Sequence, residues 1–351
     1  MDRLHIAFFG AANSGKSTLV NAICGQEVSL VSAVPGTTTD PVRKLAELPG
    51  LGPCVLIDTA GLDDSGILGP ERERRTRAVL DETDVAVLLS AVPGLIGDLT
   101  ASGVPYVNYT RGESIQALLE RIAAVAPHEE EKFLTGSLVK PGDTVVLVMP
   151  QDSEAPKGRL ILPQVQVIRE LLDRGCVPHC CTPASLPAAL SGLSGLPDLV
   201  ITDSQVFRAV NDAIPAECPL TSFSILLAAA KGDVKLFVDG AKAIDSLKPG
   251  SRVLIAEACT HVPDTEDIGR VKIPALLRKR IPDLRVDIAA GNDFPEDLSP
   301  YSLIIHCGAC VATARLVRSR IRKALLAGVP VTNYGITIAA LQGILPRVSI
   351  P

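Results

Sequence analysis

Residues 4–17 read LHIAFFGAANSGKS, an apolar run followed by a loop that begins at Gly10 and ends with Gly15, Lys16 and Ser17. The apolar run predicts a β-strand at residues 4–9, and residues 18–25 predict a helix. The loop between them fits G-x-x-x-x-G-K-S in the strand–loop–helix setting that a phosphate-binding loop requires. Its glycines let backbone N–H groups close around phosphates, and the helix N-terminus adds positive potential. This stretch therefore predicts an α/β nucleotide-binding domain.

Residues in and after this loop have expected roles toward a nucleoside triphosphate and its magnesium ion. We expect Lys16 to reach the β- and γ-phosphates and Ser17 to ligate Mg²⁺. Residues 35–40 lie where a switch loop would present Thr38 to Mg²⁺ and the γ-phosphate, and Asp58 follows the apolar strand 54–57 as a Walker-B aspartate should. The predicted nucleotide contacts are Asn13, Ser14, Gly15, Lys16, Ser17, Thr18, Thr38, Asp58, Gly61 and Asn108. Lys16 and Thr38 are the predicted catalytic residues.

With these motifs the first domain resembles the translation-factor-like GTPases related to Era and to the tRNA-modification GTPase. The matching residues are Asn13–Ser17, Gly36–Asp40 and Asp58–Gly61. In potassium-activated members of this group, the resemblance implies, an asparagine at the position of Asn13 helps to hold K⁺ beside the phosphates. Leu62 stands where Ras-like enzymes place a glutamine that orients water, so we expect slow intrinsic hydrolysis.

The base-reading segment departs from that family. The family reads guanine with N-K-x-D, and the corresponding residues 108–111 are N-Y-T-R. Asn108 is kept, but Arg111 replaces the aspartate that pairs with guanine. Loss of this contact weakens discrimination against adenine, although GTP is still the expected nucleotide.

Length and composition indicate two to three globular domains and exclude several classes of protein. The chain has 351 residues, of which 47% are apolar, and a mean hydropathy of +0.30. A net charge of −5 argues against a nucleic-acid partner, which would need a basic face. Without a signal peptide or an apolar run of transmembrane length, we expect no membrane association. Nine cysteines without the spacing of a secreted scaffold favour a reducing, cytoplasmic location.

The rest of the chain predicts two further parallel-sheet α/β domains. Apolar strands alternate with helices, for example a strand at 144–149 before a helix at 164–174, and a strand at 252–258 before a helix at 272–280. The predicted organisation is a P-loop GTPase domain at 1–128, an α/β dimerisation domain at 129–235 and an α/β cluster-binding domain at 236–351. Lys-Pro-Gly occurs at 140–142 and again at 248–250, either as a sign of duplication or as an ordinary connector.

Cysteine and histidine form a paired pattern near the end of the sequence. Cys259 and His261 follow one apolar strand. His306 ends another, and Cys307 and Cys310 follow it, so that the pattern is C-x-H…H-C-x-x-C. Thiolates suit iron–sulfur clusters or zinc, and imidazole suits zinc or iron. Ligand sites in open parallel sheets gather at the carboxyl ends of the strands, so the two halves are expected to converge. The cysteines of residues 176–181, by contrast, predict a short buried strand.

The combination of a P-loop GTPase domain, α/β domains and this pattern resembles the HydF-type maturation GTPases of iron–iron hydrogenase. Residues 219–226, PLTSFSIL, also carry the resemblance. It implies a homodimer whose last domain binds a 4Fe-4S cluster through Cys259, Cys307 and Cys310, with His261 and His306 as candidate further ligands. It also implies a carrier that receives a di-iron precursor from two radical-SAM maturation enzymes and passes it to apo-hydrogenase.

Two other classes remain open on the residues alone. A metal-insertion GTPase would bind one zinc or nickel ion at the Cys/His pattern. An RNA-modifying or ribosome-assembly GTPase is suggested by the switch motifs, although the acidic charge balance disfavours it.

Overall fold

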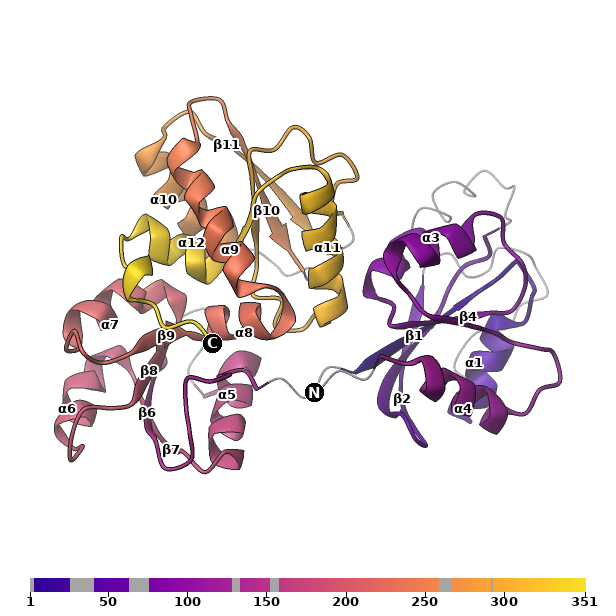
Figure 1. Ribbon diagram of the computed structural model, residues 1–351, viewed down its shortest axis with the longest axis horizontal. Helices are drawn as coiled ribbons and strands as arrows, with labels where there is room; N and C mark the ends of the chain where they lie inside the picture. Colours follow the sequence, from indigo (N-terminus) through magenta and orange to yellow (C-terminus); the bar gives the residue numbers. More distant parts are fainter. Residues whose placement is uncertain are drawn as a thin grey trace. The chain divides into compact units, whose positions relative to one another are not determined.

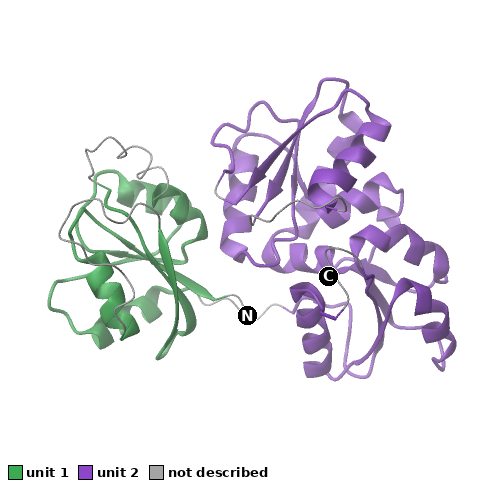
Figure 2. Cartoon of the chain, turned by 180° about the vertical axis from the view of Figure 1, so that it is seen from behind, with its two compact units in different colours: residues 1–131 green, residues 132–351 purple. Residues whose placement is uncertain are grey.

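The structure is a computed structural model that describes residues 3–25, 41–62, 76–127, 133–151, 158–258, 267–291 and 293–351. The chain divides into two compact units, residues 1–131 and 132–351, which are coloured separately in Figure 2. Among the described residues, no helix combines the length and apolarity needed to cross a membrane.

The first unit is a five-stranded sheet in the order β2-β3-β1-β4-β5. All neighbouring strands are parallel except the β2–β3 pair. The strands are β1 (Leu4–Phe9), β2 (Val42–Leu48), β3 (Gly52–Asp58), β4 (Val85–Leu88) and β5 (Tyr106–Asn108). The helices are α1 (Lys16–Cys24), α3 (Leu95–Ser102) and α4 (Ile115–Val125), with a 3₁₀ turn at Val79–Glu82.

Strand β1 is the central strand of this sheet and is buried on both faces. Ile6 and Phe8 pack into a cluster with residues of α1 and α4, while Ala7 and Phe9 pack with residues of α3. A strand covered on both sides is apolar along its length rather than alternating, which is the pattern of the LHIAFF run. The prediction of a strand at residues 4–9 is confirmed.

The second unit contains two four-stranded parallel sheets with the same connectivity, β7-β6-β8-β9 and β11-β10-β12-β13 (Figure 1). The first has β6 (Thr144–Val148), β7 (Val177–Cys181), β8 (Leu199–Thr202) and β9 (Leu220–Ser222). The second has β10 (Arg252–Glu257), β11 (Arg285–Ala290), β12 (Leu303–His306) and β13 (Val331–Asn333). The helices are α5 (Leu162–Asp173), α6 (Leu186–Ser191), α7 (Phe207–Ala213), α8 (Phe223–Lys231), α9 (Val234–Ala241), α10 (Ile273–Arg280), α11 (Ala314–Leu326) and α12 (Tyr334–Leu341). The α/β class with parallel sheets is confirmed.

The two Lys-Pro-Gly segments occupy equivalent positions in these sheets. Each forms a turn before the first strand, closed in one case by the Lys140 N–H donating to Asp143 and in the other by the Lys248 N–H donating to Ser251. Gly142 and Gly250 donate in turn to Gly175 and Asp283, which precede the neighbouring strands. The repeated letters therefore mark a repeated piece of structure.

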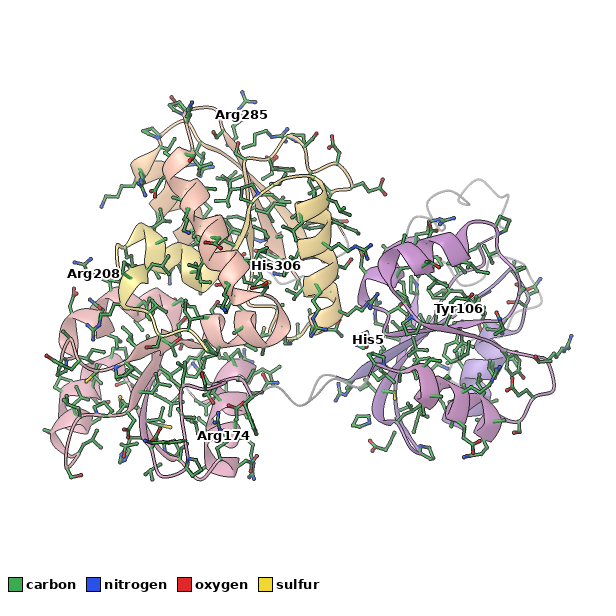
Figure 3. All side chains as sticks on the ribbon, viewed as in Figure 1. His5, Tyr106, Arg174, Arg208, Arg285 and His306 are labelled. Carbon is green, nitrogen blue, oxygen red and sulfur yellow. The ribbon has the colours of Figure 1, made fainter. Side chains whose placement is uncertain are left out.

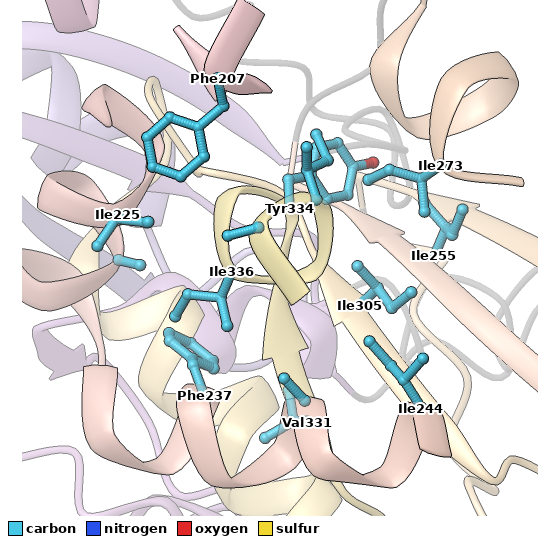
Figure 4. Close-up of a cluster of buried hydrophobic side chains, with 14 of the residues drawn as sticks. Phe207, Ile225, Phe237, Ile244, Ile255, Ile273, Ile305, Val331, Tyr334 and Ile336 are labelled. Atoms are coloured by element: carbon cyan, nitrogen blue, oxygen red, sulfur yellow. The ribbon is translucent and has the colours of Figure 1, made fainter. Parts of the chain in front are cut away.

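The two halves of the second unit share one apolar cluster (Figure 4). Phe207 and Ile225 enter it from the half with β6–β9, and Ile255 and Ile305 enter it from the half with β10–β13. Ile336 of α12 lies among them, fully buried. This common core explains why residues 132–351 form a single compact unit.

The segment at 176–181 corrects one prediction. It does contain a strand, β7, but this strand lies at the edge of its sheet and is not buried. Cys180 is exposed and Cys181 is half-buried. Apolar composition alone does not distinguish an edge strand from a central one.

Candidate nucleotide site and cysteine loop

The phosphate-binding loop connects the carboxyl end of β1 to the first turn of α1. Gly15 has φ 95° and Asn13 has φ 59°, so both adopt the left-handed conformation that lets the loop curl. The loop is anchored where Ala11 N–H donates to Ser90 Oγ at 2.8 Å, beyond the end of β4. Gly61 packs directly against it, since a Cβ there would lie 2.7 Å from the Ala12 nitrogen. The left-handed residues and the close approach of Gly61 hold residues 10–17 in a tight curl before α1.

Lys16 is held inside this loop. Its side chain is only 6% exposed, and Nζ donates to the carbonyl oxygens of Gly10 at 3.0 Å and Ala11 at 2.7 Å. These carbonyls satisfy a buried ammonium group that would otherwise be costly. The Lys16 ammonium group therefore lies where the phosphate oxygens of a bound nucleotide would compete with these carbonyls for its hydrogen bonds.

Asp58 ends β3 beside the loop and fits a magnesium site. It is 1% exposed, and neither carboxylate oxygen has a hydrogen-bond partner within the described residues. Burial raises the pKa of Asp58 above its ordinary value, while Ser17, Lys16 and Lys44 act in the opposite direction. A buried carboxylate next to a serine hydroxyl matches the oxygen chemistry of Mg²⁺, so Ser17 and Asp58 are the candidate magnesium ligands of this unit.

A pH experiment follows from Asp58. Because its folded pKa is raised, the nucleotide-free unit loses stability as pH rises from the unfolded pKa through the folded one, and that loss persists at neutral pH. We expect Asp58→Asn to abolish this pH dependence and to raise the melting temperature of the Mg²⁺-free protein at neutral pH. The same variant should no longer be stabilised by Mg²⁺ with GTP. Circular dichroism melts over a pH series measure both effects, with Glu120→Gln on the exposed face of α4 as the control; a variant with wild-type pH dependence would contradict the assignment.

The other predicted nucleotide contacts lie at the same sheet edge or outside the described residues. Asn108 ends β5 and is exposed, and its carbonyl accepts from Arg121 Nη2 at 2.7 Å. Arg111 is exposed as well. Leu62, whose backbone N–H donates to the Gly10 carbonyl at 3.3 Å, turns its side chain into the core. Thr38 lies outside the described residues.

The cysteine loop, residues 307–313, connects strand β12 to helix α11. The Cys307 sulfur accepts backbone N–H groups from Ala258 at 3.1 Å and from Ala309 at 3.4 Å. Strand β10, which ends two residues before Cys259 in the sequence, is the parallel neighbour of β12, so the carboxyl ends of the two strands lie at the same edge of the sheet. Amide donors aimed at a sulfur favour its thiolate form, which is the form that binds iron or zinc. The surroundings of Cys307 therefore fit a metal ligand.

His306 is placed differently from the cysteines. It is 1% exposed and lies in the interior of the half with β10–β13 (Figure 3). Nδ1 donates to the Cys307 carbonyl at 2.8 Å, because a carbonyl can only accept, and Nε2 then faces Arg320 Nη1 at 3.3 Å. Burial lowers the pKa of His306 to about 4, and the charge of Arg320 adds to the shift. As placed, neither nitrogen offers a lone pair to a metal, and a ligand role would require the imidazole to leave Arg320.

The structure describes three of the five predicted cluster ligands, namely His306, Cys307 and Cys310. Cys259 and His261 lie outside the described residues. Within the described part of the chain, no group of three or more His, Cys, Asp or Glu side chains is arranged to hold a metal ion. The convergence of all five predicted ligands therefore stays a prediction.

Sequence reasoning missed the buried charged residues around this loop. Glu257 ends β10 and pairs with Arg270, whose Nη2 lies 2.7 Å from Oε2. Arg320 Nη1 donates to the Glu257 carbonyl at 3.0 Å. Lys231 at the end of α8 donates to carbonyls of the cysteine loop. The position of Glu257 at the end of an apolar strand was a possible signal, but the basic partners come from other elements.

Three family models match the chain. The model described as the 50S ribosome-binding GTPase matches residues 5–130, that of the hydrogen maturase F dimerization domain residues 134–232, and that of the hydrogen maturase F tetramerization domain residues 235–351. The first is a GTPase domain, the kind of domain that binds GTP with Mg²⁺ and hydrolyses it. The other two indicate self-association.

The chain is also similar to tRNA modification GTPases MnmE. That of Acidiphilium cryptum is 41% identical over 105 residues, covering 29% of this chain and 24% of the relative. That of Methylobacterium sp. strain 4-46 is 34% identical over 163 residues, covering 40% and 35%. The chain thus spans about a quarter to a third of the length of these relatives.

Solved structures of GTPases match at low similarity. Era in complex with MgGDPNP and part of 16S ribosomal RNA is 16% identical with a TM-score of 0.30, covering 52% of this chain and 93% of that one. Aquifex aeolicus Era bound to GDP and AlF₄⁻ is 15% identical with a TM-score of 0.28, covering 84% and 97%. The family models, by contrast, follow one another along nearly the whole sequence. The chain belongs to the HydF-type hydrogenase maturation GTPases and carries a GTPase domain similar to that of the tRNA modification GTPases MnmE.

Proposed function

We propose that this chain binds a 4Fe-4S cluster through Cys259, Cys307 and Cys310 and carries a di-iron precursor to apo iron–iron hydrogenase. The observation that carries the proposal is the environment of Cys307, whose sulfur accepts two backbone N–H groups after the carboxyl end of β12, the parallel neighbour of β10. Three thiolates leave one iron without a cysteine, and a labile ligand there could give way to a guest.

The nucleotide would act through the loops around the first sheet. Lys16 would leave the Gly10 and Ala11 carbonyls for the phosphates, and Ser17 and Asp58 would hold Mg²⁺. Asn13 is exposed in the phosphate loop, where a K⁺ ion that stimulates hydrolysis would sit. With the Leu62 side chain in the core, no group at that position orients the attacking water, which supports slow intrinsic hydrolysis.

The proposed partners follow from the family. They are a second copy of the chain in a homodimer, two radical-SAM maturation enzymes and the apo-hydrogenase, all in the cytoplasm. Release of the switch loops on hydrolysis would change contacts with these partners or between domains. No nucleic acid is proposed, in keeping with the net charge of −5.

The test is iron and sulfide content with EPR on anaerobically reconstituted protein. We expect about four irons per chain and a reduced-cluster signal, both lost or strongly reduced in Cys307→Ser. Cys180→Ser, the same change on the exposed edge strand β7, is the matched control and should behave as wild type. A colourless protein that binds one zinc ion would overturn the proposal and favour a metal-insertion GTPase.

A further inference from the structure

Lys231 is a buried lysine that reaches from one half of the second unit into the cysteine loop of the other. It is the last residue of α8 and only 6% exposed. Its Nζ donates to the carbonyls of Ala312 at 2.7 Å and Ala309 at 3.0 Å and lies 3.5 Å from that of Cys310. Lysine is almost never this buried unless partners compensate it. Here the carbonyls of Ala309 and Ala312, on either side of the predicted cluster ligand Cys310, accept hydrogen bonds from the buried ammonium group.

The loop that Lys231 holds has a conformation that needs support. Ala309 has φ 51°, in the left-handed region that is unfavourable for a residue with a Cβ by about 1–2 kcal/mol. In this conformation its N–H donates to the Cys307 sulfur while its carbonyl accepts from Lys231. One residue thus links the lysine to the thiolate environment of Cys307.

Helix α8 contacts the same region at its other end. The Ser224 hydroxyl accepts from Asn333 Nδ2 at 3.0 Å, and a Cβ on Gly308 would lie 3.6 Å from that hydroxyl. The helix therefore lies along the cysteine loop, with Ser224 near Gly308 and the Lys231 ammonium near Cys310. Helix α8 belongs to the half that matches the dimerization model, and the loop belongs to the half that matches the tetramerization model.

We propose that Lys231 is a positioning residue that fixes the cysteine loop and places a positive charge beside the cluster. The inference rests on the proposed function. A cluster held by three thiolates gains a negative charge on one-electron reduction, and a nearby buried cation stabilises that charge in a medium of low dielectric constant. Lys231 would thereby raise the reduction potential as well as hold the loop.

The test compares Lys231→Met, which removes the donors and the charge, with Lys231→Arg, which keeps the charge. Lys235→Met, four residues away on the exposed face of α9, is the matched control. Redox titrations with dithionite, followed by EPR on the reconstituted full chain, give the midpoint potential. We expect Lys231→Met to disfavour the reduced cluster about tenfold, a shift of about 59 mV to lower potential. Lys231→Arg should recover most of this shift, and Lys235→Met should show none.

Hydrogen exchange on the apo-protein tests the positioning role without the cluster. Exchange of the amides in residues 307–313 should accelerate at least about tenfold in Lys231→Met, which corresponds to a loss of about 1.4 kcal/mol in the free energy of local opening. Exchange should stay unchanged in Lys235→Met. Unchanged exchange, or a wild-type potential in a Lys231→Met protein that has taken up its cluster, overturns the proposal. A wild-type protein that takes up no iron and sulfide overturns the proposed function instead, and the exchange result then decides the positioning role alone.

Discussion

Lys16→Ala is expected to lower the rate of GTP hydrolysis by roughly 10²–10³-fold, the usual effect of removing one group that stabilises transition-state charge. The ammonium is buried and bound to the Gly10 and Ala11 carbonyls, so it already lies at the phosphate loop and needs little reorganisation to reach a nucleotide. From there its positive charge would stabilise the negative charge that develops on the phosphoryl oxygens during hydrolysis.

Phosphate release with Mg²⁺ and K⁺ present measures this effect. Arg43→Ala, which removes one positive charge from β2 and breaks an ion pair with Glu82, is the control and should hydrolyse GTP as wild type does. Hydrolysis within about twofold of wild type in Lys16→Ala would contradict the role of Lys16. The same variant examines coupling between the two sites: if partner release and hydrogenase activation are unchanged, the nucleotide state does not control cluster transfer.

Arg270→Met is expected to lower the free energy of unfolding of the second unit by about 3–5 kcal/mol, because it leaves a buried charge without its partner. Glu257 is 2% exposed, and Arg270 approaches both of its carboxylate oxygens, with Nε at 3.2 and 3.1 Å and Nη2 at 2.7 Å. Few donors in the interior could replace a bidentate guanidinium.

Urea unfolding followed by circular dichroism measures the loss. The double variant Arg270→Met with Glu257→Gln should recover a large part of it, since the unpaired charge is then removed. Arg252→Met provides a matched control on the same strand, because the Arg252–Asp287 pair is 40% and 39% exposed and should contribute about 0–1 kcal/mol. Equal losses of unfolding free energy for Arg270→Met and Arg252→Met would show that the burial of Glu257 does not determine how much its ion pair stabilises the unit.

The sequence alone determined the local features of the chain. The phosphate-binding loop is contiguous, so its glycines, Lys16 and the flanking strand and helix could all be predicted from neighbouring residues. Central strands of the parallel sheets, such as β1, β6 and β10, were predicted because burial on both faces makes each of them a short apolar run. For the same reason, Cys307 could be predicted to follow the carboxyl end of β12.

The tertiary structure decided what depends on residues that are distant in the sequence. Helix α12 escaped prediction because it is buried on all sides and shows no amphipathic period. The edge position of β7 depends on which strands pair, and composition does not encode that. The hydrogen bond from Lys231 to the Ala309 carbonyl joins residues that are 78 positions apart in the sequence. The orientation of the His306 ring depends on Arg320, which lies 14 residues away on α11. Sequence patterns report the environment of one segment, whereas buried polar pairs depend on the packing of several segments at once.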